Sequence, residues 1–374
     1  MFFHFVKKGD SLYELSKKYN ISIEKISNDN SLISDSNLVV NQCLLIDDKK
    51  NSYSKQTAVF NAYCYEGSNI DNVRSFLDNL TFLSIFSYQV KEDGTLNKID
   101  DQRFIDEAKK YNVKPVMVIT NSKEKGGFSP SLARKIISNN EVTNNLFNNI
   151  LSIIKSKGYY GLNIDFEYVY EKDKDLFINF IKKAADFFED YYLSISLAPK
   201  TSSSQKGLLY EAHDYEKLSK YVNHVILMTY EWGYTYGPSL PVAPFNKVQD
   251  VLEYATSVID KNKIIMGLPN YGYDFKIPYI ENQKAKSITN PKAIPLAFNN
   301  HAQIVHDNVT KTPSFKYKEN NQLHEVQFDD PYSIENKLSL IDDLDIAGAS
   351  IWTASSKCNY IPLLINQLYN VEKL

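Results

Sequence analysis

Eight short apolar runs, separated by stretches of helical periodicity, are the feature that most limits how this chain can fold. Runs of this kind are typical of buried β-strands, and they lie at residues 59–65, 82–88, 114–120, 159–168, 193–198, 222–230, 263–268 and 347–352. Helices are expected at 71–79, 102–111, 143–157, 173–190, 247–260 and 333–343. Eight strands alternating with helices favour a closed parallel sheet inside a ring of helices. We therefore predict an α/β fold, the (β/α)8 or TIM barrel, over residues 57–374.

The stretch from about 273 to 332 is too long to be the single helix that follows the seventh strand. Compact domains rarely contain a structureless loop of this length. We expect an inserted α+β subdomain there, between strand seven and the last helix. Asp330, near its end, is interpreted as a scaffold residue rather than a substrate contact.

The first 47 residues predict a separate small βααβ unit. A short strand at Phe3–Val6 precedes a helix that Ser11 or Asp10 can cap. A second short helix ends near Asn30, and a return strand lies at Cys43–Ile46. Residues 48–56 are polar and charged, which is typical of a linker.

Charge and apolar patterning exclude several classes of protein. The net charge is −3, so no basic excess favours a nucleic acid or a membrane surface. No apolar run approaches the eighteen residues of a membrane span, and the apolar N-terminal run is too short for a signal peptide. Three distant cysteines and six scattered histidines lack metal-ligand spacing. We expect no metal, no other cofactor, and synthesis without a signal peptide.

The fourth predicted strand, YYGLNIDFEY at 159–168, carries the most informative pattern. Its apolar and polar residues alternate, so Asn163, Asp165 and Glu167 share one face, about 7 Å apart per two residues. Neighbouring buried carboxylates raise the pKa of at least one of them. A carboxyl group that stays protonated near neutral pH can act as a general acid. The alternative is an edge strand whose polar face meets water.

In a parallel barrel, functional residues lie where the strands end. The candidates at this rim, besides the two carboxylates, are Tyr230 and Trp232 at strand six, Asn270 and Tyr271 after strand seven, and Trp352 at strand eight. An acid pair with a tyrosine and a tryptophan is a plausible sugar site, because tryptophan offers a flat stacking surface and tyrosine a hydrogen bond. Two alternatives stay open: Tyr230 facing water, and Trp352 as core packing.

The N-terminal segments GDSLYELSKKYNIS, IEKISNDN and NQCLLI resemble a LysM module. The resemblance implies binding of glycans that contain N-acetylglucosamine, such as peptidoglycan or chitin. Asn41 stands where the family usually has glycine, and asparagine tolerates the left-handed conformation that such a turn requires. The alternative is a small packing domain without a ligand.

Four further motifs, GLNIDFE, MTYEW, GLPNYGYD and GASIWT, look in this order like glycoside hydrolase family 18, the chitinase family, over about 58–374. The spore-type members, which join LysM modules to the barrel and degrade cortex peptidoglycan during germination, are the most similar. The resemblance implies substrate-assisted retaining catalysis. Glu167 protonates the leaving oxygen, Asp165 orients the substrate's 2-acetamido group, Tyr230 donates to its oxygen, and Trp352 lies under the cleaved sugar.

This resemblance predicts a spore-cortex N-acetylglucosaminidase, acting as a monomer on N-acetylglucosamine-containing glycan in the spore cortex or coat. Asn163, Asn270, Tyr271, Trp232 and Trp352 are the expected substrate-binding residues. Typical chitinases have aspartate where Asn163 stands, so the pH profile is expected to differ from theirs. The alternatives are a chitinase or chitooligosaccharide hydrolase, and a glycan-binding lectin without activity.

Overall fold

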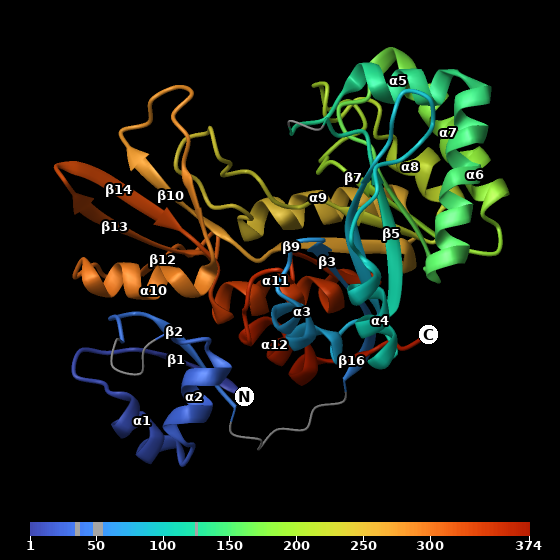
Figure 1. Ribbon diagram of the computed structural model, residues 1–374. Coiled ribbons are helices and arrows are strands. Elements are labelled where there is room, and N and C mark those ends of the chain that lie inside the picture. The colour runs from blue at the N-terminus through green and yellow to red at the C-terminus, as the bar shows by residue number, and fades with distance from the viewer. Residues whose placement is uncertain (34–37, 48–54, 124–125) are drawn as a thin grey trace.

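A closed barrel of eight parallel strands forms the larger part of the molecule (Figure 1). The computed structural model describes residues 1–33, 38–47, 55–123 and 126–374, so most of the expected linker, 48–54, lies outside the described residues. The barrel strands are β3 (Gln56–Tyr65), β4 (Phe82–Gln89), β5 (Lys114–Thr120), β6 (Gly161–Asp165), β7 (Tyr192–Leu197), β8 (His224–Leu227), β9 (Ile264–Pro269) and β15 (Gly348–Trp352). Pairing of β15 with both β9 and β3 closes the barrel, which confirms the predicted fold class.

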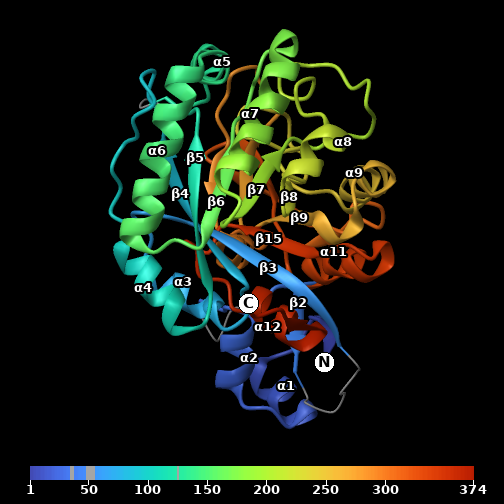
Figure 2. The ribbon, with the colours of Figure 1, turned by 90° about the vertical axis from the view of Figure 1, so that its right-hand side faces the viewer.

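Helices surround these strands (Figure 2). They are α3 (Ile70–Leu77), α4 (Gln102–Lys110), α5 (Pro130–Ser138), α6 (Asn140–Lys157), α7 (Lys174–Phe187), α8 (Tyr215–Leu218), α9 (Phe245–Val258), α11 (Pro331–Leu344) and α12 (Tyr360–Leu368). The sequence predictions omitted α5, α8 and α12. Helix α12 is almost entirely apolar, YIPLLINQL, and so lacks the periodic polar face on which such predictions depend. A short strand, β16 (Tyr369–Val371), pairs beside β3.

The interior of the barrel holds apolar and polar layers. Side chains from alternating strand positions fill its apolar part: Val59, Tyr63, Phe82, Val116, Val118, Ile226 and Ile265. Asn61 joins two other strands, because its amide donates to Ser350 Oγ at 2.8 Å and accepts from Ser84 Oγ at 2.8 Å. These buried polar groups are therefore hydrogen-bonded beneath the end of the barrel where the strands terminate.

A five-stranded antiparallel sheet with one helix is inserted between β9 and α11. Its elements are β10 (Gly272–Ile277), β11 (Lys286–Ile288), α10 (Asn290–Asn299), β12 (Val305–His306), β13 (Pro313–Glu319) and β14 (Gln322–Gln327). Asp330 follows the insertion and caps α11 by accepting from the Ser333 N–H at 2.9 Å. It also lies 2.7 Å from His306 Nε2, so its contacts are those of a scaffold residue.

The N-terminal unit comprises β1 (Phe2–Phe5), α1 (Leu12–Tyr19), α2 (Ile23–Asp29) and β2 (Cys43–Ile46), with β1 and β2 antiparallel. Ser11 caps α1 through the Glu14 N–H, while the Asp10 carboxylate accepts from the Lys7 N–H instead. Asn41 adopts φ +65°, the left-handed conformation that its position was expected to require.

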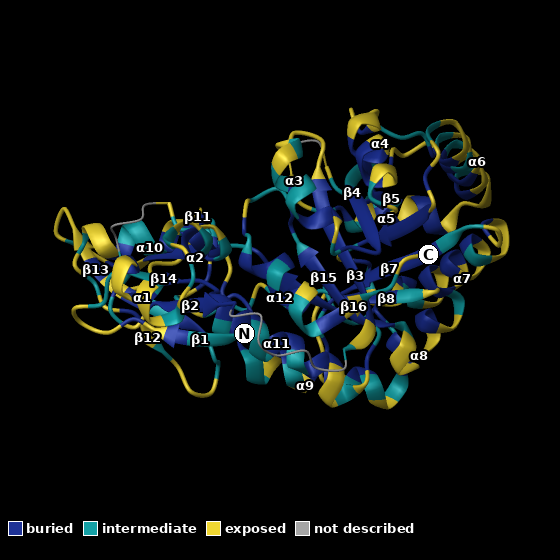
Figure 3. Ribbon diagram, turned by 90° about the horizontal axis from the view of Figure 1, so that it is seen from below, coloured by how far each residue is buried: buried dark blue, intermediate teal, exposed yellow. Residues whose placement is uncertain are grey.

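This unit packs against the insertion and against the barrel (Figure 3). Asn41 Nδ2 donates to the Ile304 carbonyl of the insertion at 3.1 Å, a bond that glycine could not make. The Phe5 ring contacts the rings of His306 and Tyr332 edge-on, with centroids 5.2 and 5.6 Å away. Within the described ranges, no helix is long and apolar enough to cross a membrane.

Candidate active site

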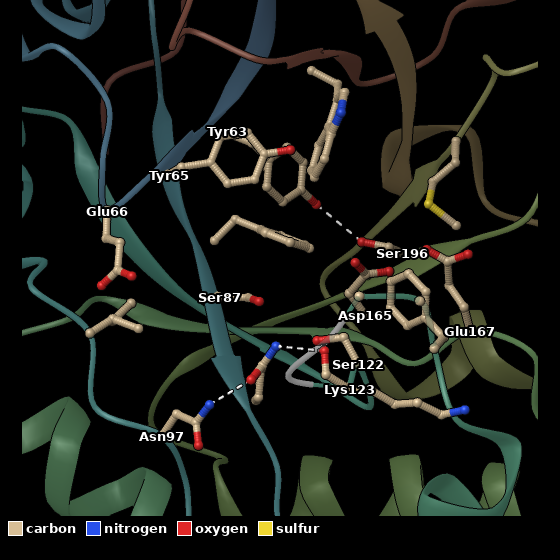
Figure 4. Close-up of a pocket in the computed structure, with 18 of the residues that line it drawn as sticks. Tyr63, Tyr65, Glu66, Ser87, Asn97, Ser122, Lys123, Asp165, Glu167 and Ser196 are labelled. Atoms are coloured by element: carbon tan, nitrogen blue, oxygen red, sulfur yellow. Dashed lines mark hydrogen bonds between the residues drawn. The ribbon is translucent and has the colours of Figure 1, made fainter. Parts of the chain in front are cut away.

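A cavity of about 690 Å³ opens at the end of the barrel where the strands terminate (Figure 4). Its walls come from strands β3, β4, β6, β7 and β15, from the segment that follows β8, and from residues 97–99, 122–123 and 126–128. Five of the eight residues expected in the site line it: Asp165, Glu167, Tyr230, Tyr271 and Trp352. The strand ends therefore bring together residues that are almost 190 positions apart in the chain, from 165 to 352.

Burial sets the protonation of the two carboxyl groups. Asp165, the last residue of β6, is 4% exposed, and its Oδ1 has no hydrogen-bond partner among the described residues. Burial raises its pKa from 3.8 to about 7. Burial, together with the negative charges of Asp165 and Glu231, raises the pKa of Glu167 well above its ordinary value. This shift favours the protonated form of Glu167, which is the form that a general acid requires.

Two buried side chains hold the turn that carries Glu167. Asn121 accepts from the Glu167 N–H and donates to the Glu167 carbonyl, both at 2.9 Å. On the other side, His213 Nε2 lies 3.0 Å from the Phe166 carbonyl, and the Ala198 N–H donates to His213 Nδ1 at 2.9 Å. Because Nδ1 accepts, the proton of the neutral ring is on Nε2, and burial lowers the pKa of His213 to about 4. The acid is thus fixed through its backbone.

Aromatic rings form the other wall. The Trp352 ring is stacked on Tyr230 at a centroid distance of 6.4 Å, and Phe86 meets it edge-on at 4.9 Å. Trp352 is half-buried and lines the cavity, so it is not plain core packing. Tyr230 lines the cavity and packs against the barrel core, and burial raises the pKa of its hydroxyl well above its ordinary value. Gly267 leaves room for the tyrosine, because a Cβ there would lie 2.7 Å from its ring.

Asn163 lies below the cavity rather than on its wall. It is fully buried, its Nδ2 donates to Ser194 Oγ at 2.9 Å, and its Oδ1 accepts from the Tyr63 hydroxyl at 3.3 Å and from Ser196 Oγ at 3.1 Å. None of these bonds reaches Asp165. The alternation along β6 correctly placed Asn163 on the same face, but two residues earlier on the strand means one layer deeper in the barrel.

Asn270 and Trp232 also lie outside the lining of this cavity. The Asn270 N–H donates to the Trp352 carbonyl at 2.7 Å, and its Nδ2 donates to the carbonyls of Thr353 and Ser356 at 2.9 and 3.0 Å. Asn270 therefore fixes the loop after β15, and it lines a neighbouring cavity of about 250 Å³. The Trp232 side chain packs against the barrel core.

Glu231 is a third acid in the cavity that the sequence predictions omitted. It adopts φ +69° after β8, and its Oε1 accepts from the hydroxyls of Tyr271 and, at 3.0 Å, Tyr273. Burial raises its pKa. The signal was present in MTYEW, where this acid stands between two residues already assigned to the site.

Other lining residues belong to loops that no motif identifies. The Asn97 amide donates to Gln89 Oε1 at 2.5 Å and so joins one loop to the end of β4 (Figure 4). Ser122 and Lys123 come from the loop after β5. In the part of the chain that the structure describes, no group of three or more His, Cys, Asp or Glu residues is arranged to hold a metal ion.

This arrangement suits the hydrolysis of a glycosidic bond by acid catalysis, and the chain belongs to the glycosyl hydrolases family 18. The model of that family matches residues 50–356, and the LysM domain model matches residues 4–47. Both resemblances inferred from the sequence are therefore confirmed.

Among curated relatives, the chain is similar to the cortical fragment-lytic enzyme of Bacillus subtilis (strain 168). The two are 38% identical over 300 residues, 79% of this chain and 69% of the relative. The enzyme of the same name from Bacillus anthracis is 34% identical over 402 residues, 93% of each chain. The crystal structure of the Bacillus megaterium QM B1551 spore cortex-lytic enzyme SleL superimposes with a TM-score of 0.94 at 31% identity, covering 100% of this chain and 99% of that one.

Proposed function

We propose that this chain hydrolyses the glycan strand of spore cortex peptidoglycan during germination, as an N-acetylglucosaminidase that cuts after N-acetylglucosamine. The observation that carries the proposal is the pair Asp165 and Glu167, side by side on one strand end in one cavity, with raised pKa values. The names of the relatives, cortical fragment-lytic and spore cortex-lytic enzymes, support the choice of substrate.

The reaction is a substrate-assisted displacement with retention. Glu167 donates its proton to the glycosidic oxygen while the carbonyl oxygen of the sugar's 2-acetamido group attacks the anomeric carbon. Asp165, once ionised, accepts from the acetamido N–H and stabilises the positive charge of the oxazolinium intermediate. The Glu167 carboxylate then takes a proton from water as that water attacks the anomeric carbon, and the bond from this carbon to the acetamido oxygen breaks, which restores the 2-acetamido group. Tyr230 donates to the acetamido oxygen, and Trp352 stacks under the sugar.

Glu231 is the carboxylate that a double-displacement mechanism would use as its nucleophile. Such a nucleophile lies about 5–5.5 Å from the acid, across the scissile bond. Glu231 instead shares one oxygen with two tyrosine hydroxyls, which stabilise its charged form and make it a weaker nucleophile. We assign to it the role of a neighbouring charge that keeps Glu167 protonated.

The mechanism restricts the substrate. Because the acetamido group is the nucleophile, the sugar on the non-reducing side of the cut must carry an N-acetyl group. Muramic lactam residues lack it, so the cut follows N-acetylglucosamine. Both the LysM module and the family 18 barrel indicate binding of such glycans.

Mass spectrometry of the products tests the proposal. Purified spore cortex, with and without prior cutting by a transglycosylase, is digested in parallel with chitooligosaccharides. New reducing ends are expected at N-acetylglucosamine, and reducing muramic acid would contradict the assignment. Digestion of chitooligosaccharides alone would identify a chitinase. Glu167→Gln is expected to bind the strand without turnover, whereas a wild-type chain that binds without releasing product would be a lectin.

The remaining proposals concern organisation and location. We propose a division into a LysM module at 1–47, a linker at 48–56 and the catalytic barrel at 57–374, acting as a monomer in the spore cortex or coat. Asn163, Asn270 and Trp232 are proposed to act on substrate binding only indirectly, through the residues that they position.

A further inference from the structure

A second cavity, of about 910 Å³, lies where the LysM module meets the rest of the chain. Its volume falls in the range of about 300–1,000 Å³ that is usual for ligand sites. Helix α2 and residues 31–33 form one wall, the start of α10 forms another, and the loop after β15 forms the third. We call it the junction cavity.

Hydrogen bonds hold the walls of the junction cavity in place. The Asn359 N–H donates to Ser31 Oγ at 2.6 Å, and Asn359 Nδ2 donates to Asn28 at 2.7 Å (carbonyl) and 3.0 Å (Oδ1). On the barrel side, Asn72 Nδ2 donates to the Ser355 carbonyl at 2.8 Å. The LysM module is therefore attached directly to the loop that begins at the active-site tryptophan.

The lining of the junction cavity includes polar side chains, and one of them carries a hydroxyl that lacks a partner among the described residues. Ser27 is 8% exposed, lines the cavity, and its Oγ makes no hydrogen bond with any described residue. Buried polar groups are nearly always hydrogen-bonded, because leaving one without a partner costs free energy. A sugar hydroxyl or amide in the cavity would supply the missing bond.

The smaller cavity of about 250 Å³ lies between the junction cavity and the active site and shares lining residues with both. That cavity shares Tyr65, Glu231, Tyr271 and Trp352 with the active site, and it shares Ser356 with the junction cavity. It too holds an unpartnered buried atom, Asn270 Oδ1, among the described residues. The three cavities therefore follow one another from the catalytic carboxylates to the LysM module, each sharing at least one lining residue with the next.

We propose that the junction cavity is a glycan-binding site shared by the LysM module and the barrel, and that it binds the same strand that is cleaved in the active site. This inference rests on the proposed function for the identity of the strand. Two exposed lysines in the lining of the junction cavity, Lys292 and Lys357, make no ion pair with described residues. The lining contains one acid, Glu24. The excess of positive charge suits a glycan that carries carboxylates, as muramic acid does, better than a neutral chitin chain.

When one glycan strand binds at both the active site and the junction cavity, its affinity depends on its length. Once the active site holds one part of the strand, the second contact is intramolecular and gains from a high effective concentration. Fragments that fill only the active site obtain no such gain. The enzyme should therefore prefer long strands, with the preference residing in the junction cavity.

Calorimetric titration of the full chain tests this, with Glu167→Gln as the background so that no strand is cut. The probes are soluble cortex strand fragments of increasing length, with neutral chitooligosaccharides as a second series. One double variant carries Lys292→Glu and Lys357→Glu. The control double variant carries Lys182→Glu and Lys318→Glu, at two exposed lysines outside the three cavities. Two exposed charge contacts predict a loss of about tenfold in affinity for long strands relative to short ones.

The proposal is supported if affinity rises with strand length in Glu167→Gln alone and with the control substitutions at Lys182 and Lys318, but not with the substitutions at Lys292 and Lys357. The same loss for short fragments, or no loss with the substitutions at Lys292 and Lys357, overturns it. Ser27→Ala gives a second measurement, because its hydroxyl supports no described bond. Weaker binding of long strands at an unchanged unfolding temperature is expected, and a lower unfolding temperature with unchanged binding contradicts the proposal. If wild type does not cut cortex, the proposed function fails, while the binding series still reports on the junction cavity.

Discussion

Replacing Asp165 by asparagine should abolish activity yet stabilise the protein at alkaline pH. The carboxyl group has its ordinary pKa of 3.8 in the unfolded chain and a pKa of about 7 in the fold. Between these values the folded state binds more protons than the unfolded state, so stability falls as pH rises. At about 1.4 kcal/mol per pKa unit, the ionised Asp165 costs the fold about 4 kcal/mol above pH 7.

Asparagine removes this cost but introduces another. Its amide group has the shape of the carboxyl group, and it places two buried N–H donors where Asp165 Oδ1 has no partner among the described residues. Leaving such donors unbonded costs about 1–3 kcal/mol at any pH. Relative to wild type, the free energy of unfolding of Asp165→Asn should therefore be higher by roughly 2 kcal/mol at pH 8 and lower by roughly 2 kcal/mol at pH 4. The difference between the variant and wild type therefore changes sign with pH.

Urea unfolding of both proteins at pH 4, 6 and 8, at one ionic strength, measures this difference. Asp190→Asn, an exposed aspartate on another surface, is the matched control and should show no such swing. A difference between Asp165→Asn and wild type that stays constant from pH 4 to pH 8 would refute the reasoning, because it would mean that Asp165 titrates alike in the folded and unfolded chains.

Three further predictions concern the same cavity. Glu231→Gln removes a negative charge that raises the pKa of Glu167, so the alkaline limb of kcat/KM against pH should move to lower pH; an unmoved limb would assign that limb to another group. Gly267→Ala places a Cβ 2.7 Å from the Tyr230 ring, and a loss of about 1–3 kcal/mol in urea unfolding together with a lower kcat is expected. Asn121→Ala frees the backbone of Glu167 and should lower kcat about tenfold or more with little change in KM, a split that steady-state kinetics can contradict.

The sequence predicted the barrel well because its strands are buried on both faces and appear as apolar runs. The alternation along β6 was enough to place Asp165 and Glu167 in one cavity. Strand and helix periodicity gave no comparable signal for α12, which is almost entirely apolar, or for α5, whose C-cap Asn139 is also the N-cap of α6. The insertion was detected only by its length.

Residue roles were harder to predict than strands, because depth in a barrel is a tertiary property. The alternation placed Asn163 on the correct face of β6, but the residue lies one layer deeper in the barrel than the cavity wall. Its bonds to Ser194 and Ser196 on β7 depend on strand register. Glu231 follows its strand in a left-handed conformation, so the period of two no longer describes where its side chain points. The walls at 97–99, 122–123 and 126–128 come from loops, whose positions no local pattern fixes.

The pairing of β15 with β3 places the first and last strands of the barrel side by side, and it determines when this enzyme can become active during its own synthesis. Glu167 leaves the ribosome midway through translation, but Trp352 and its aromatic neighbours Tyr63 and Tyr65 meet only when that final strand has docked. The catalytic acid is then present for almost half of translation without a surface to hold a sugar. A chain that ends before β15 is therefore expected to lack the aromatic surface that Trp352 completes.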